Sequence, residues 1–191
     1  MQPSAQFEQA APPSLWQHRN FMRYWIALII SSVGDQFTAL AVPLTAVLML
    51  GATPSQMGYL VALQTASFLL ISLFAGVWID RLPRRRIIIT TDLGRATVLL
   101  AIPVLAHFGA LKMWHVYVIM GLTGIQTVFS SLSEQAYLPL LIGRRQVVQG
   151  NSRLEAAWSV SGMIGPTLAG IVIRSEEHTS ELQSRFGISY A

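Results

Sequence analysis

The chain has 191 residues, of which 52% are hydrophobic and only 12% are charged, whereas soluble domains average about 25% charged residues. This composition excludes an ordinary soluble domain and indicates a membrane protein, so the net charge of +4 is not a sign of nucleic-acid binding. The chain has no cysteine, which excludes disulfides and thiolate chemistry, and its histidines are scattered without metal-ligand spacing. We expect no metal and no cofactor.

The first 19 residues are polar and rich in Ala, Pro and Gln, so we expect residues 1–19 to form a disordered cytoplasmic tail. The first two predicted membrane spans cover about residues 24–50 and 56–79, and each exceeds the roughly 20 residues that a crossing needs. The turn between them carries no charge. Pro54 in this turn is expected to stop the first helix.

A short basic turn after the second span sets the orientation of the chain. Its residues 76–86 read GVWIDRLPRRR. Because this turn lies between two apolar runs, it must lie at a membrane surface, and the positive-inside rule assigns that surface to the cytoplasm. Arg86 is explained by topology alone. Asp80 weakens the topological signal little, so we expect this carboxylate to have a function.

Three further spans are predicted at about residues 87–108, 114–138 and 156–173, giving five transmembrane helices within residues 20–173. Lys112 lies in an outside turn, whereas most basic residues fall on the predicted cytoplasmic side. The sequence therefore predicts an all-α polytopic membrane protein with a cytoplasmic N-terminus. The basic residues on the cytoplasmic side are Arg19, Arg23, Arg81, Arg84, Arg85, Arg86, Arg144, Arg145 and Arg153.

Asp35 lies within the first span, 12 residues after Arg23 and so about 18 Å along the helix. An ionisable group at that depth costs several kcal/mol unless it faces a cavity, finds a partner or takes up a proton. Asp35 is therefore a candidate for proton coupling or for binding a cationic substrate. The alternative is a structural carboxylate that bonds to nearby polar side chains or to a part of the fold not seen in this sequence.

Asp92 and Arg95 lie three residues apart near the cytoplasmic end of the third span. Such a pair can satisfy itself on one helix face, which favours a structural role. The pair can also join Asp80 and its arginines, together with Glu134 of the fourth span, in a charge cluster at the inner mouth. Other polar residues are candidates for lining a cavity or for interhelical hydrogen bonds: Gln64, Thr65, Ser67, Gln126 and Thr127.

The pattern Gly-x-x-x-Asp-Arg-x-x-Arg-Arg, at Gly76, Asp80, Arg81, Arg84 and Arg85, resembles the loop between helices two and three of major facilitator superfamily transporters. Pro83 stands where the family usually has glycine. The resemblance implies a twelve-helix carrier whose two six-helix halves rock around a midplane site, and a gating role for these residues. The chain would then hold the first five helices of that fold and lack the remainder of its own protein.

The fifth span carries small residues around a proline, which resembles the fifth-helix motif of the drug–proton antiporters. These residues are Ser161, Gly165, Pro166, Ala169 and Gly170. A generic packing face of small residues is the alternative. The fourth span lacks the arginine that many such antiporters carry. Gly34-Asp35 and residues 92–96 are similar to the efflux branch that holds macrolide exporters and the enterobactin exporter.

This resemblance implies part of a secondary efflux carrier in a bacterial inner membrane. It would export a small hydrophobic compound, drug or siderophore by proton antiport, with the lipid bilayer, a small substrate and protons as partners. An uptake carrier of the same superfamily and a non-transporting membrane subunit remain alternatives. No nucleophile–base pair or phosphate loop indicates an enzyme.

Residues 174–191 break the apolar pattern in mid-span. Residues 174–184 and 188–191 match the translation of a sequencing-library adapter on both sides of a gap of the size of an index. We therefore expect residues 174–191 to be a non-native tail and exclude them from inferences on fold or function. Resequencing the locus from genomic DNA tests this: codons for Glu176 to Ser184 continuous with the gene would contradict it.

Overall fold

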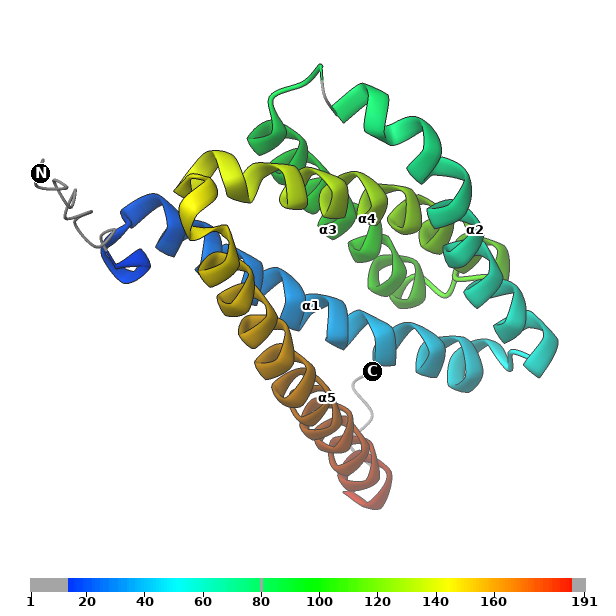
Figure 1. The fold of residues 1–191 in the computed structure, drawn as a ribbon. Coiled ribbons are helices and arrows are strands. Elements are labelled where there is room, and N and C mark those ends of the chain that lie inside the picture. The colour runs from blue at the N-terminus through cyan, green and yellow to red at the C-terminus, as the bar shows by residue number, and fades with distance from the viewer. Residues whose placement is uncertain (1–13, 80, 187–191) are drawn as a thin grey trace, which may run out of the picture.

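The structure, a computed structural model, describes residues 14–79 and 81–186. Its described part is all-α, as predicted, and contains five long helices and two short 3₁₀ helices (Figure 1). These are η1 (Leu15–Gln17), α1 (Arg19–Leu50), α2 (Pro54–Ile79), α3 (Arg84–His107), α4 (Met113–Ile142), η2 (Arg144–Gln146) and α5 (Val147–Phe186). Helices α1 to α4 are long and apolar enough to cross a membrane. The fifth predicted span lies inside α5 and stays a prediction, as does the origin of residues 174–191.

Several helix ends differ from the predicted ones, because capping residues set them rather than hydropathy. His18 begins α1 by accepting a hydrogen bond of 3.2 Å from the Phe21 N–H, so residues 15–19 belong to the described helices rather than to the predicted tail. Gly51 ends α1 in the left-handed conformation, with φ 61°, which glycine adopts without strain. Pro54 then starts α2, where its missing N–H costs no helical hydrogen bond.

The basic turn is also shorter than predicted. Pro83 is the N-cap of α3, with φ −68°, so Arg84, Arg85 and Arg86 form the first turn of that helix rather than the loop. At the same end of the bundle, α4 continues through Pro139 to Ile142. Arg84, Arg85 and Arg86 therefore belong to α3 and not to the loop before it.

The helices pack in two groups. Helices α2 and α3 each pack against α4, whereas α5 packs mainly along α1, and a smaller contact between α1 and α4 joins the groups. Figure 1 shows α5 crossing α1 and projecting away from α2, α3 and α4. The large apolar side chains of α2 are mostly exposed, for example Leu69 and Leu73 at 67% and 77%, as expected for helices that face lipid or further helices.

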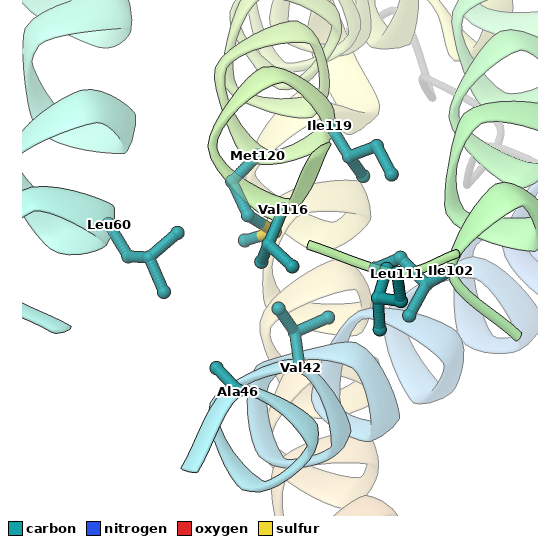
Figure 2. Close-up of a cluster of buried hydrophobic side chains, with 8 residues drawn as sticks. All are labelled: Val42, Ala46, Leu60, Ile102, Leu111, Val116, Ile119 and Met120. Atoms are coloured by element: carbon teal, nitrogen blue, oxygen red, sulfur yellow. The ribbon is translucent and has the colours of Figure 1, made fainter. Parts of the chain in front are cut away.

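Two of the three buried apolar clusters in the described part of the chain lie at opposite ends of the bundle, and the third, Ala75, Ile79, Ile87 and Val128, joins α2, α3 and α4 next to the basic turn. We call the two at opposite ends the Val116 cluster, which Figure 2 shows, and the Phe21 cluster. The Val116 cluster consists of Val42, Ala46, Leu60, Ile102, Leu111, Val116, Ile119 and Met120. The Phe21 cluster consists of Leu15, Phe21, Leu28, Leu138, Ile142, Leu154 and Ala157.

The start of the chain is fastened to the start of α5 beside the Phe21 cluster. The guanidinium carbon of Arg153 lies 4.1 Å from the centroid of the Trp16 ring, a cation–π geometry. Trp16 also meets Trp25 edge-on, with ring centroids 5.6 Å apart. The Trp25 indole N–H donates a hydrogen bond of 3.1 Å to the Arg153 carbonyl. Residues 15–25 and α5 are thereby held together at this end.

Candidate functional site

Arg95 lies at the centre of a polar layer between the Val116 and Phe21 clusters. Its Nη1 is 3.0 Å from Asp35 Oδ1 and its Nη2 is 2.9 Å from Asp92 Oδ1. Nη2 also donates a hydrogen bond of 2.8 Å to the Ser31 hydroxyl. The Arg95 side chain is 12% exposed, against 47% for Asp35. The guanidinium is thus enclosed, while the Asp35 carboxylate remains accessible.

The Arg95–Asp35 ion pair connects the two helix groups. Arg95 belongs to α3 and Asp35 to α1, and these two helices are not among the close packings within the described residues. Arg95 lies ten residues after Arg85, or about 15 Å along α3, which matches the predicted depth of Asp35. The hydrogen bond from Arg95 to Ser31 and the apolar contacts of the Val116 cluster also connect α1 and α3, so breaking the ion pair would remove a polar link between these helices.

Asp35 and Arg95 line two adjoining cavities. One has a volume of about 160 Å³ and lies among α1, α3, α4 and α5. The other has a volume of about 210 Å³ and lies among α1, α2, α3 and α4. Thr127 lines both cavities as well. The ion pair therefore stands where a small molecule entering either cavity would meet it.

Glu134, expected in the inner charge cluster, belongs to this polar layer. It accepts a hydrogen bond of 3.1 Å from the Ser130 hydroxyl, lines the smaller cavity and lies on α4. Asp92 and Arg95 are thus ion-paired near Asp35, and Glu134 lines the same cavity as Asp35 and Arg95. Their expected contact with Asp80 stays a prediction.

The residues of the basic turn have separate surroundings. Arg84 reaches α4, where its Nη1 donates a hydrogen bond of 3.3 Å to the Ala136 carbonyl. Arg81 and Arg85 are exposed, and Gly76 lies in the last turn of α2 with open space around it. Asp80 lies outside the described residues. Arg84 therefore ties the start of α3 to the end of α4.

The fifth-helix motif packs against α1 beside Asp35. Gly165 is buried, and a Cβ at this position would overlap the Cβ of Gln36, so only glycine allows this approach of α5 to α1. Ser161 is fully buried, and its hydroxyl has no hydrogen-bond partner among the residues that the structure describes. Pro166 and Gly170 are exposed, and the side chain of Ala169 lies outside the described part.

Among the other polar candidates, Gln64 lines the larger cavity. Thr65 bonds to a carbonyl of its own helix at 3.0 Å. The Ser67 hydroxyl lies 2.8 Å from a carbonyl of its own helix and 3.5 Å from the Gly121 carbonyl of α4, and Gln126 packs against Gly94. Sequence reasoning did not identify Trp158 as a wall of the smaller cavity. Its spacing of three residues from Ser161 places it near the same helix face, a signal that was available.

The sequence model of the Major Facilitator Superfamily matches residues 24–176, which include the polar layer, the basic turn and all of the fifth-helix motif. The chain belongs to the Major Facilitator Superfamily. Members of this superfamily are transporters and not enzymes, and the apolar helices α1 to α4 make the chain part of a multi-pass membrane protein.

Curated relatives of the chain include proteins named as efflux proteins or efflux pumps. Over 168 residues, 84% of the chain, it is 27% identical to the uncharacterized MFS-type transporter YfiS of Bacillus subtilis. Over 97 residues, 51% of the chain, it is 27% identical to macrolide efflux protein A of Enterococcus faecalis. Over 114 residues, 57% of the chain, it is 31% identical to the multidrug efflux pump Tap of Mycolicibacterium fortuitum.

The matched segments cover only 37%, 30% and 28% of the lengths of these three relatives. The chain therefore corresponds to about a third of a typical relative. No solved structure gives a significant match to the chain.

Proposed function

We propose that this chain is the N-terminal part of a secondary active efflux transporter. It exports a small hydrophobic compound, drug or siderophore in exchange for protons. The observation that carries the proposal is the Arg95–Asp35 ion pair, which lies at mid-depth in the bundle and lines two cavities. Relatives named as a macrolide efflux protein and a multidrug efflux pump support export over uptake.

Asp35 is the coupling residue in this proposal. As a carboxylate it holds Arg95 and so links α1 to α3. When Asp35 takes up a proton or binds a cationic substrate, its negative charge is neutralised, and its ion pair with Arg95 is weakened. Because the ion pair joins the two helix groups, its formation or loss changes their preferred relative position, as an alternating-access carrier requires.

The basic turn forms the inner gate. Arg81, Arg84 and Arg85, with Asp80, hold the inner ends of the helices together in the outward-facing state. The hydrogen bond from Arg84 to the Ala136 carbonyl of α4 supports this role. The close contact of Gly165 with Gln36 keeps α5 against α1 next to the coupling residue, which gives the fifth-helix motif its place in the mechanism.

The membrane is the bacterial inner membrane, with the N-terminus in the cytoplasm. The starts of α1, α3 and α5 carry Arg19, Arg84 and Arg153, and the last two of these residues contact the end of α4 or the segment before α1. The arginine-rich loops therefore share one end of the bundle, which the positive-inside rule assigns to the cytoplasm. Lys112 precedes α4 at the opposite end.

Everted membrane vesicles test this function with the longer protein that the locus is expected to encode. An imposed pH gradient, acidic inside, should drive drug accumulation in vesicles. Asp35→Asn should abolish this accumulation while the protein still inserts, whereas Glu155→Gln, an exposed site on α5, should leave it unchanged. Gradient-driven transport that persists in Asp35→Asn would show that Asp35 is structural. Uptake in right-side-out vesicles, with no export, would reverse the direction.

A further inference from the structure

The polar layer carries more negative than positive charge. Among the described side chains, Arg95 is the only basic one that lines either cavity, while Asp35 and Glu134 line the smaller cavity. The guanidinium is already bound by Asp35, Asp92 and Ser31. Glu134 accepts a hydrogen bond from Ser130 and has no ion pair among the side chains that the structure describes. Its carboxylate therefore lines the cavity without a cation of its own, because the guanidinium of Arg95 is taken up by Asp35 and Asp92.

The wall around Glu134 suits a positive ligand. Trp158 of α5 and Leu28 of α1 supply apolar surface to the smaller cavity, and aromatic faces attract cations. The remaining wall carries hydroxyl groups, which can turn their oxygen toward a positive charge. They belong to Ser31, Ser32, Thr127, Ser130 and Ser131. A carboxylate, an aromatic ring and hydroxyl oxygens around one space are the groups that recognise an amine or a quaternary ammonium.

The size of the cavity limits what it can hold. Its volume of about 160 Å³ is smaller than the roughly 300–1,000 Å³ of sites for drug-sized ligands, so it accepts a head group and not a whole drug. The adjoining cavity of about 210 Å³ is walled by Ala39, Leu99 and Met120 besides its polar groups. It could hold an apolar portion of the same molecule.

We propose that Glu134 and Trp158 form a subsite for a compact cationic head group, a protonated or quaternary amine, of the transported compound. That the bound compound is transported rests on the function proposed above, whereas the binding of a cation at Glu134 and Trp158 does not. Asp35 and Arg95 stand between this subsite and the larger cavity. An amine bound at Glu134 would therefore lie beside the ion pair that couples α1 to α3.

Binding of tetramethylammonium to the 191-residue chain in phosphatidylcholine nanodiscs tests the subsite. Saturation-transfer NMR on the methyl protons gives the affinity, with tert-butyl alcohol as an uncharged probe of similar shape. We expect tetramethylammonium to bind and the alcohol to bind at least tenfold more weakly, a difference of about 1.4 kcal/mol. Equal binding of the two probes would overturn the proposal.

Two variants and their matched controls locate the site. Glu134→Gln keeps the shape of the side chain and removes its charge, and it should weaken binding about tenfold. Trp158→Leu should weaken it several-fold. Glu155→Gln and Trp114→Leu change exposed residues of the same types outside the cavity and should bind as the parent does. Unchanged affinity in Glu134→Gln would overturn the proposal, because Glu134 would then contribute no charge to the bound cation.

Circular dichroism checks that each variant keeps its helix content. If Glu134→Gln does not insert, Trp158→Leu decides alone, because it changes no charge, and unchanged binding in that variant overturns the subsite. The assay uses no ion gradient. Failure of export in the longer protein would therefore contradict the proposed function but not the subsite. Export by a protein that does not bind tetramethylammonium would contradict the subsite but not the proposed function.

Discussion

Arg95 and Asp35 are 60 residues apart in the chain, yet Arg95 Nη1 lies 3.0 Å from Asp35 Oδ1 and joins α3 to α1. The enclosed guanidinium is neutralised by Asp35 and by Asp92 on its own helix. Removing a cation from such a group leaves buried negative charge, whereas removing all the charges together does not. The structure of the layer thus depends on the balance of these three side chains.

Arg95→Met should therefore destabilise the bundle, by about 1–3 kcal/mol after discounting for the partial exposure of both carboxylates. Adding Asp35→Asn and Asp92→Asn should recover most of that loss. Thermal unfolding in detergent micelles, followed by circular dichroism, measures both effects. Arg86→Gln, at an exposed site on the same helix, is the control. A triple variant as unstable as Arg95→Met would show that charge balance is not the cause.

Asp80→Asn should reduce export by the longer protein while leaving the amount in the membrane unchanged, because the gate would lose its carboxylate. Arg84→Ala should act in the same direction, since it removes the hydrogen bond to the Ala136 carbonyl. Initial export rates, normalised to protein by immunoblot, provide the measurement. Arg86→Gln serves again as the control. Full activity in Asp80→Asn would remove the gate role from this residue.

Gly165→Ala should loosen the packing of α5 on α1, because the new methyl group would overlap the Cβ of Gln36, which cannot move without its backbone. Overpacking of this kind costs about 1–3 kcal/mol. Gly162→Ala, where nothing lies within 4 Å, should be neutral or slightly stabilising, since alanine favours a helix. Thermal unfolding compares the two variants. Equal stability would mean that α5 does not approach α1 this closely.

Trp16 and Arg153 should contribute jointly to the stability of the inner end. A double-mutant cycle with Trp16→Leu and Arg153→Gln should give a coupling energy of about 0.5–1 kcal/mol, as expected for an exposed cation–π pair. Trp114→Leu in place of Trp16→Leu gives the control cycle, which should show no coupling to Arg153. Additive effects of Trp16→Leu and Arg153→Gln would contradict a direct contact between the side chains.

The number and order of the helices could be predicted from hydropathy and loop charge, because both follow from the requirement to cross a bilayer. The helix ends could not be, since His18 and Pro83 set them by local capping. Pro54 illustrates the difference. The sequence predicts that Pro54 stops the first helix, whereas in the structure it starts the second, where its missing N–H costs no hydrogen bond.

The polar layer was predicted in its parts and not in its connections. The contact between Asp92 and Arg95 follows from their spacing on one helix. The contact of Arg95 with Asp35 depends on the rotation of α1 and α3 about their axes, and hydropathy defines this poorly because lipid-facing and buried sides are equally apolar. The depths of Asp35 and Arg95, each about 15–18 Å from the nearest inner arginines, were the signal that could have paired them.

The Phe21 and Val116 clusters lie on either side of the polar layer and its two cavities. They share no residue, and on α1 their nearest members, Leu28 and Val42, are 14 residues or about 21 Å apart. Each is built from seven or eight buried apolar side chains. Parting the helices at one end would therefore bring one set of apolar side chains into water, at a cost that grows with the area exposed, and would leave the other set buried.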